Sequence, residues 1–272
     1  MPKRAECIAF ANHKGGTGKT SSCLSIAGHL AKSGAKVLMV DFDPQANATS
    51  GMGIDTAVLQ HSIYDAVLAQ CDGYQGLPVT QVVLETDVVN LHVVPSELDL
   101  AAAEVIMQHT GKRTGILKRA LEEVRPLYHY ILIDLPPSAG LLTINGLCAS
   151  DQVVVLLEPS IFSLETLGNL RTVFGDIRRM AGCPISRVTV VLNRYQKRSI
   201  FSRAFHSCSP SQEVEVRLRE MFDTVFVVPE SVEIYKAQRE GIPVSHYAPG
   251  SKVARAYAKI AESICRGTAK SK

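Results

Sequence analysis

Tryptophan is absent from this 272-residue chain, and aromatic residues make up only 6% of it. Aromatic stacking platforms are therefore not expected to dominate its function. The chain also carries little net charge, +3 from 29 basic and 26 acidic residues. This balance does not indicate a nucleic-acid binder, although a local basic patch can be hidden within a nearly neutral total.

Close cysteine pairs and long apolar runs are missing too. The seven cysteines are an odd number and no two have the C-x-x-C spacing, which disfavours a disulfide framework and a zinc or iron–sulfur site built on such pairs. No apolar run reaches the roughly 18 residues of a membrane-spanning helix, and the N-terminal residues are too polar for a signal peptide. These absences predict a cytoplasmic protein with reduced thiols.

The composition that remains is ordinary for a globular protein, with 46% apolar and 20% charged residues. Short runs rich in Val, Ile and Leu recur along the chain and alternate with helical patterns. Because most of these runs do not alternate with polar residues, they are typical of strands covered on both faces in a parallel sheet. We predict one doubly wound α/β domain over residues 1–272, with a mostly parallel sheet and ligands at the carboxyl ends of its strands.

The elements of this domain follow from the same patterns. The predicted strands are Cys7–Asn12, Lys36–Asp43, Val88–Pro95, Tyr130–Leu135, Gln152–Glu158, Arg187–Asn193 and Val225–Val228. The predicted helices are Lys19–Lys32, Glu97–His109, Thr114–Val124, Leu141–Ala149, Leu164–Met180 and Glu213–Met221. No repeat or linker rich in Pro, Gly or Ser divides the chain.

The strongest motif follows the first predicted strand. Residues 14–20, Lys-Gly-Gly-Thr-Gly-Lys-Thr, match the phosphate-binding loop G-x-x-x-x-G-K-[ST], except that Lys and Gly fill its early positions. Glycines let successive N–H groups face phosphate oxygens, and the start of the following helix adds its dipole. The motif predicts that Lys19 contacts the β- and γ-phosphates and that the Thr20 hydroxyl binds Mg²⁺. The predicted nucleotide-binding residues of this loop are Lys14, Gly15, Gly16, Thr17, Gly18, Lys19, Thr20 and Ser21.

Aspartates end two of the predicted strands. Asp41 and Asp43 are expected on one face at a strand end, where two carboxylates can hold the waters of Mg²⁺ and orient an attacking water. Asp134 ends the strand before Pro136 and Pro137, and this Walker-B arrangement binds Mg²⁺ through water. The alternatives are a turn or helix cap for the first pair and a buried structural role for Asp134.

These motifs together resemble the ParA/MinD family of P-loop ATPases. Lys14 matches the signature lysine of the family's deviant Walker A loop, K-G-G-x-G-K-[ST], and residues 41–53 resemble the D-x-D-P-Q-x-N-x-T-x-G-x-G stretch of ParA and Soj partition ATPases. The resemblance implies an ATP-dependent homodimer in which Lys14 reaches the partner's nucleotide while Lys19 acts in cis. It also implies that Asp43 positions the hydrolytic water, with Asp41 nearer the outer shell of the metal. A solvated lysine beside the loop is the alternative for Lys14.

The resemblance is looser after residue 190. Asn193 falls where the family lines its adenine pocket, and its amide can pair with an adenine edge. Pro229 and Ser231 fall in the family's V-I-P-R-N-V segment, where Pro is kept but Arg and Asn are replaced by Glu230 and Ser231. An ordinary turn explains Pro229–Ser231 about as well as contact with the base.

ParA-type dimers bind DNA non-specifically through basic residues in their C-terminal half. Residues 187–220 contain seven basic and three acidic residues, a local excess of four positive charges. The resemblance places a DNA contact at Arg198, and the basic stretch suggests three more, at Arg203, Arg217 and Arg219. A solvated surface explains any one of these arginines equally well.

The sequence therefore predicts an Mg²⁺-dependent ATPase that segregates chromosome or plasmid DNA with a ParB-like partner, in the cytoplasm and on the nucleoid. A MinD-like ATPase at a membrane is one alternative, but the stripe Val253, Tyr257, Ile260 and Ile264 near the C-terminus is surrounded by alanines and is more typical of a helix packed on its own domain. A ParA-like ATPase that positions a protein cargo is another. An ATP-dependent ligase on the same fold is a third, although no small-molecule pocket is evident.

Overall fold

The computed structural model describes residues 4–12, 15–159, 185–195 and 210–270. These residues form an eight-stranded sheet in the order β3-β4-β2-β5-β1-β6-β7-β8. Every neighbouring pair is parallel except β3 and β4, so the predicted doubly wound, mostly parallel α/β fold is confirmed. The strands are β1 (Glu6–Ala11), β2 (Val37–Asp41), β3 (Leu84–Glu85), β4 (Leu91–Val94), β5 (Tyr130–Asp134), β6 (Gln152–Leu157), β7 (Arg187–Tyr195) and β8 (Val225–Pro229).

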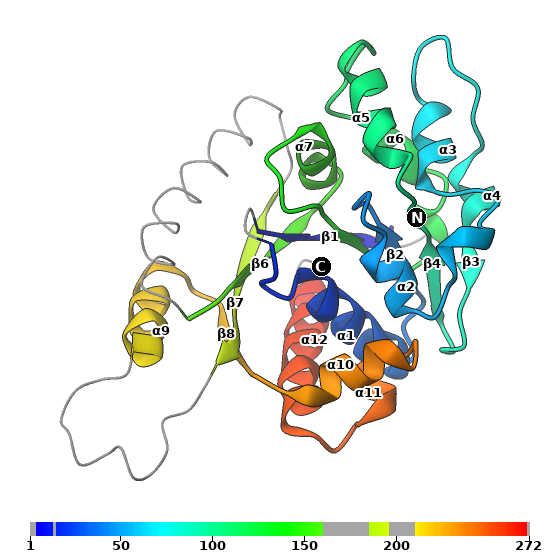
Figure 1. Cartoon of the computed structure of the whole chain (residues 1–272). Coiled ribbons are helices and arrows are strands. Elements are labelled where there is room, and N and C mark those ends of the chain that lie inside the picture. The colour runs from blue at the N-terminus through cyan, green and yellow to red at the C-terminus, as the bar shows by residue number, and fades with distance from the viewer. Residues whose placement is uncertain (1–3, 13–14, 160–184, 196–209, 271–272) are drawn as a thin grey trace, which may run out of the picture.

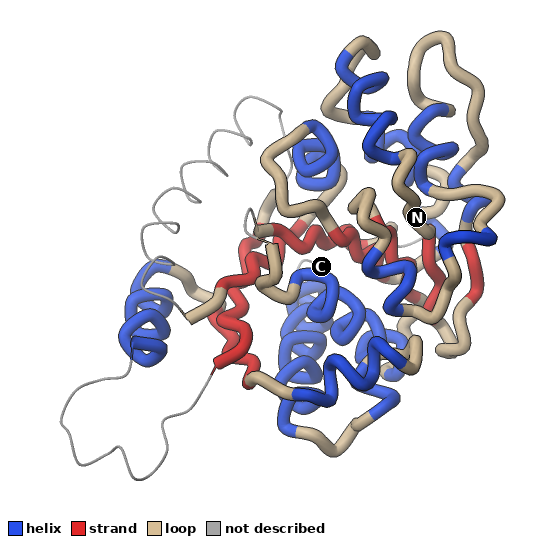
Figure 2. The backbone as a smooth tube through the Cα atoms, in the orientation of Figure 1, coloured by secondary structure: helices blue, strands red, loops and turns tan. Residues whose placement is uncertain are grey.

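Helices cover both faces of this sheet (Figures 1 and 2). One face carries α1 (Lys19–Lys32), α2 (Asn47–Gly51), α10 (Val232–Arg239), α11 (Val244–Tyr247) and α12 (Lys252–Lys270). The other face carries α3 (Ile63–Leu68), α4 (Val79–Val82), α5 (Leu100–Gln108), α6 (Ile116–Leu121), α7 (Leu141–Cys148) and α9 (Pro210–Met221). The predicted helix at 164–180 lies outside the described residues.

Both faces of the central strands are buried, which explains their uninterrupted apolar sequences. On β1, Cys7 and Ala9 pack into one hydrophobic core, whereas Ile8 and Phe10 pack into the other. All four side chains are inaccessible to solvent. Alternate residues of β1 thus pack into different cores. A polar side chain on either face of the strand would be buried and would need a hydrogen-bond partner.

Several boundaries differ from the predicted ones for local reasons. The strand predicted from Val88 begins only at Leu91, because Asn90 has a left-handed φ of +67° that breaks the extended backbone. The strand predicted to Asp43 ends at Asp41. Strand β7 continues beyond Asn193 to Tyr195 through an irregularity in its pairing with β8. Strand β3 was not predicted, since two residues give no periodicity.

The C-terminal helix α12 packs on its own domain. Its stripe Val253, Tyr257, Ile260 and Ile264 is buried against the core that contains α1, and the Tyr257 hydroxyl lies 3.0 Å from the Ser22 hydroxyl. The apolar face of α12 is therefore used inside the fold. None of the described helices combines the length and the apolar character that a membrane crossing requires.

Four of the described cysteines, Cys7, Cys23, Cys71 and Cys265, are free thiols. Reduced thiols in the chain as a whole stay a prediction.

Candidate active site

The loop between β1 and α1 opens onto a cavity at the carboxyl ends of the strands. Gly16 and Gly18 have φ angles of +79° and +83°, a conformation that glycine adopts without strain. A Cβ atom at Gly15 or Gly16 would meet no atom of the described residues within 4 Å, so the space in front of this backbone is open. Because no described side chain caps α1, its first N–H groups and its positive dipole end are available to an anion.

The cavity has a volume of about 680 Å³, and its walls come from five segments of the chain. It is lined by Gly15, Gly16, Gly18, Lys19, Thr20 and Ser21 of the loop and α1, by Asp43, Gln45, Asn47, Ser50 and Gly51 after β2, by Pro137 after β5, by Arg194 of β7, and by Tyr235, Gln238 and Arg239 of α10. The structure therefore brings Asp43 together with the predicted loop residues. Thr17, although it belongs to the loop, does not line the cavity and is buried.

Lys19 places a buried positive charge in the cavity wall. It is 6% exposed, and burial lowers the pKa of its amine, while the carboxylates of Asp134 and Asp43 act in the opposite direction. An ammonium group that is removed from water needs such negative partners or a bound anion. The arrangement suits an amine that binds phosphate oxygens.

Thr20 and Asp134 form a pair of oxygen groups beside Lys19. The Thr20 hydroxyl donates to Asp134 Oδ2 at 2.6 Å. The other oxygen, Asp134 Oδ1, is buried and has no hydrogen-bond partner among the described residues. Burial, reinforced by the nearby charge of Asp41, raises the pKa of Asp134 to about 8. A buried carboxylate oxygen without a donor, next to a hydroxyl, fits the hard oxygen ligands that Mg²⁺ prefers.

The two aspartates at the end of β2 have different surroundings, although the sequence predicted them on one face. Asp43 lies beyond the end of the strand and lines the cavity. Asp41 is fully buried: its Oδ2 accepts from the Thr49 backbone N–H at 2.8 Å and from the Thr49 hydroxyl at 2.7 Å. Its Oδ1 accepts from the Asp43 backbone N–H at 3.2 Å. Burial raises the pKa of Asp41 to about 6, and the bonds from Thr49 oppose this shift. Asp41 fixes the turn that carries Asp43, and its place in a metal's outer shell stays a prediction.

Asn193 contacts the phosphate loop. Its buried side-chain amide donates to the Thr17 carbonyl at 2.9 Å, and a Cβ atom at Gly18 would lie only 2.1 Å from Asn193 Nδ2. Gly18 therefore needs to be glycine both for its left-handed backbone and for this close approach. The predicted contact between Asn193 and adenine stays a prediction, because the structure uses this amide to support the loop.

Replacing Asn193 with alanine is expected to weaken nucleotide binding about tenfold, because the buried Thr17 carbonyl loses a donor and the loop loses its support. If the support is the main effect, affinities for ATP and GTP fall by the same factor in isothermal titration calorimetry. Asn145→Ala is the matched control, since the hydrogen bonds of Asn145 within the described part of the chain go to backbone groups of α6, α7 and the segment before α6. A selective loss of ATP over GTP would instead indicate the predicted base contact.

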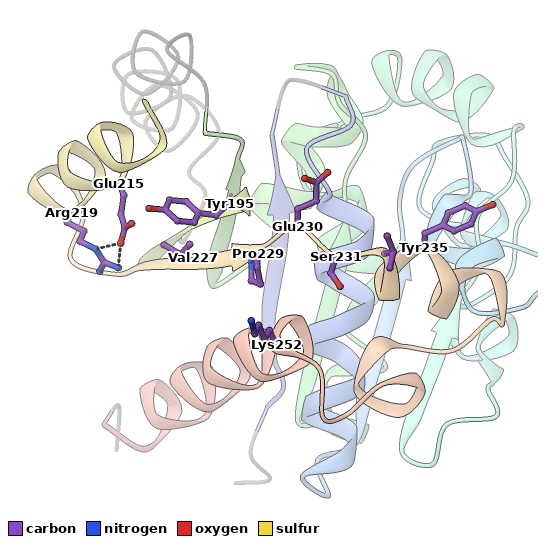
Figure 3. A pocket seen from close by; sticks show the side chains of 10 residues that line it. Tyr195, Glu215, Arg219, Val227, Pro229, Glu230, Ser231, Tyr235 and Lys252 are labelled. Carbon is purple, nitrogen blue, oxygen red and sulfur yellow. Dashed lines mark hydrogen bonds and ion pairs between the residues drawn. The ribbon is translucent and has the colours of Figure 1, made fainter. Parts of the chain in front are cut away.

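A second pocket, of about 1210 Å³, adjoins the first through Tyr235, which lines both. Figure 3 shows Pro229 and Ser231 on the chain that leads from β8 into α10, with Val227 and Tyr195 beside them. The Ser231 hydroxyl caps α10 by accepting from the Glu233 backbone N–H, and it donates to the Glu233 carboxylate. The two predicted base-contact residues thus lie beside the phosphate cavity, in a pocket whose wall is partly apolar.

Sequence reasoning missed the contribution of α10. Tyr235, Gln238 and Arg239 line the phosphate cavity, but no helix was predicted over this segment. A usable signal was present: Ser231 is an N-cap residue, and Glu233 follows in the first turn of the helix. Arg194 was also missed as a cavity residue, because its direction depends on the irregular end of β7.

The described arginines of the basic stretch at 187–220 are all ion-paired. On α9, Arg217 pairs with Glu213 at 3.0 Å and Arg219 with Glu215 at 2.9 Å. Arg187 pairs with Glu6 of β1, and Arg194 with Glu158. The pairs on α9 are half-exposed and cost little to break, so a role of Arg217 and Arg219 in binding DNA stays a prediction. Lys14, Arg198 and Arg203 lie outside the described residues.

Comparison with known proteins assigns the chain to a family. A family described as an AAA domain matches residues 5–183. The chain is 36% identical over 259 residues to the sporulation initiation inhibitor protein Soj of Bacillus subtilis, an alignment that covers 94% of this chain and 97% of Soj. It is 33% identical over 262 residues to the chromosome partitioning protein ParA of Caulobacter vibrioides, with 94% and 92% of the two chains covered.

A solved structure shares the fold of this chain. A crystal structure described as cobyrinic acid a,c-diamide synthase from Mycobacterium smegmatis, with bound ADP and magnesium, superposes with a TM-score of 0.78 at 26% identity. The superposition covers 98% of this chain and 97% of that one. On the identity with Soj and ParA over nearly its whole length, the chain belongs to the ParA/Soj family of partition ATPases, within the ParA/MinD superfamily.

Proposed function

We propose that the protein is an ATP-driven switch that binds DNA without sequence preference and segregates chromosome or plasmid DNA together with a ParB-like partner. The observation that supports this most directly is one cavity lined by Lys19, Thr20 and Asp43. This cavity lies in a chain similar over nearly its full length to Soj and ParA. Both relatives are named for roles that involve sporulation or the chromosome, and neither name is that of a metabolic enzyme.

The described residues contribute phosphate binding, metal binding and orientation of water to the hydrolysis of ATP. The open backbone of the loop and the amine of Lys19 bind the phosphates. Thr20 and Asp134 would hold Mg²⁺, which would supply positive charge to neutralise the phosphates. The carboxylate of Asp43 orients the attacking water and does not bind the phosphates. Hydrolysis therefore depends on a residue that takes no part in phosphate binding.

The switch requires a second copy of the chain. ATP binding brings two subunits face to face, and Lys14 of each completes the other's site. The closed dimer then presents Arg198, Arg203, Arg217 and Arg219 to the DNA backbone. After the partner protein stimulates hydrolysis, the dimer opens and DNA is released, which makes slow basal turnover an expected property of the cycle.

Binding to duplex DNA of unrelated sequences, measured by fluorescence anisotropy, tests this proposal. Wild-type protein is expected to bind with ATP but not with ADP, and affinity should fall steeply between 50 and 200 mM salt. Lys14→Ala should abolish ATP-dependent dimers in analytical ultracentrifugation and DNA binding with them. Arg198→Ala combined with Arg203→Ala should remove DNA binding while dimers persist, and Lys118→Ala on α6 serves as the control. Absence of ATP-dependent DNA binding would overturn the proposal. If the protein then floated with liposomes in the presence of ATP, the MinD-like alternative would be favoured.

A further inference from the structure

Arg194 lies at the tip of β7 in an unusual backbone conformation. Its φ is +53°, in the left-handed region that a non-glycine residue rarely occupies and that tends to be retained at functional sites. In the pairing of β7 with β8, Leu192 stands opposite Val227 and Tyr195 opposite Pro229. Two residues of β7, Asn193 and Arg194, therefore face one residue of β8, which is a β-bulge.

This bulge directs two consecutive side chains to the same site. In a regular strand, Asn193 and Arg194 would point to opposite faces of the sheet. Here Asn193 donates to the Thr17 carbonyl under the phosphate loop, and Arg194 lines the cavity in front of that loop. The bulge thus serves to bring the guanidinium of Arg194 to the cavity.

The partner of Arg194 in this structure can be replaced by another anion. Arg194 Nη1 lies 3.0 Å from Glu158 Oε1, and the side chains are 53% and 25% exposed. Such a half-exposed pair contributes little stability of its own. A phosphate group offers a guanidinium two acceptor oxygens and more negative charge than one carboxylate.

The charge of the cavity favours this exchange. Among its lining residues three are basic, Lys19, Arg194 and Arg239, and one is acidic, Asp43. The start of α1 adds the positive end of a 14-residue helix. We propose that Arg194 is a nucleotide-binding residue, which exchanges its ion pair with Glu158 for a phosphate group of the bound nucleotide. Glu158 then acts as a competitor that holds the guanidinium when no nucleotide is present.

The affinity for fluorescently labelled ATP in the presence of Mg²⁺ tests this proposal through two substitutions that break the same ion pair. Arg194→Asn removes the guanidinium while keeping a side chain that tolerates the left-handed backbone, and it should weaken binding about tenfold. Glu158→Gln removes the competitor and should tighten binding about two- to threefold. In the Arg194→Asn background, Glu158→Gln should have no effect, because the residue that it releases is absent.

A purely structural ion pair gives a different pattern. Both substitutions would then change affinity in the same direction and by similar factors, and this result, or an unchanged affinity in Arg194→Asn, would overturn the proposal. Arg266→Gln on α12 is the matched control, because it breaks another exposed pair, with Glu262 at 3.2 Å, away from the cavity lining. Thermal unfolding without nucleotide checks that each variant is folded. Since DNA and partner protein are left out, the result is independent of the proposed DNA role.

Discussion

Lys19→Ala is expected to lower ATP hydrolysis about 1000-fold and to weaken ATP binding strongly, the largest loss among single substitutions in the cavity. The reason is the position of the amine. Lys19 is buried in the cavity wall, and its charge interacts with those of Asp134 and Asp43. Without it, the carboxylates of Asp134 and Asp43 remain near the phosphates of ATP and are no longer offset by the Lys19 charge, so their repulsion adds to the lost attraction.

The measurement is phosphate release at saturating ATP, together with calorimetric titration of Mg-ATP. Lys32→Ala is a matched control on the same helix, because Lys32 lies in its last turn and donates to the Ser245 carbonyl at 3.1 Å. We expect Lys32→Ala to hydrolyse ATP at the wild-type rate. Thermal unfolding is measured as well, because removing one member of a buried charge cluster leaves the carboxylates uncompensated and is expected to lower the stability of Lys19→Ala. Hydrolysis within tenfold of wild type would contradict this account of the cavity.

The fold could be predicted from local sequence because its determinants are local. Buried parallel strands need apolar residues at every position, and runs such as Tyr130–Asp134 stand out for this reason. The phosphate loop was equally visible, since glycines, Lys19 and Thr20 are adjacent in the chain. The short strand β3 and the helix α10 were missed, because two residues have no period and α10 has only one buried residue, Ala237.

The environments of single side chains could not be predicted, because they depend on distant partners. Asn193 is bonded to Thr17, which lies 176 positions earlier in the chain. Nothing near Asn193 in the sequence indicates whether its amide meets a base or a backbone carbonyl. The same holds for Arg194, whose direction follows from a bulge in the pairing of two strands.

The pairing of two arginines in the basic stretch could have been predicted from the sequence. The net excess of four charges at 187–220 already subtracts Glu213 and Glu215, but Arg217 and Arg219 were named as DNA contacts without regard to these partners. Both have a glutamate four residues earlier, the spacing that forms ion pairs along a helix, and both pairs are present. Any surplus for binding phosphate therefore depends on Lys197, Arg198 and Arg203, outside the described residues.

The second large effect is expected at Asp43. Asp43→Asn should lower turnover at least about 100-fold, the usual contribution of a residue that accepts or orients a proton in the transition state. ATP affinity should stay within about threefold of wild type. The substitution is conservative for the fold: Asp43 Oδ1 accepts from the Gln45 backbone N–H at 3.0 Å, and asparagine keeps an oxygen for that bond. Only the negative charge facing the cavity is lost.

Asp41→Asn provides the contrast, since the sequence predicted a functional role for both aspartates, with Asp43 positioning the water and Asp41 in the outer shell of the metal. At Asp41 one oxygen accepts two bonds from Thr49 and the other accepts from the Asp43 backbone. An amide NH₂ placed among these donors leaves at least one bond unmade, at a cost of about 1–3 kcal/mol. The melting temperature should therefore fall by several degrees, given a shift of about 2–4 °C per kcal/mol, whereas that of Asp43→Asn should not change.

The two variants together decide what each carboxylate does. Phosphate release, Mg-ATP titration and thermal unfolding are measured on both, so that a catalytic loss is separated from a loss of structure. Loss of turnover at an unchanged melting temperature in Asp43→Asn supports a role in orienting water, while near-normal turnover would exclude it. If Asp41→Asn kept its stability but bound Mg²⁺-nucleotide poorly, the outer-shell role predicted from sequence would hold instead. The structure favours the first outcome, because all three hydrogen bonds to the Asp41 carboxylate come from protein groups that shape the turn carrying Asp43.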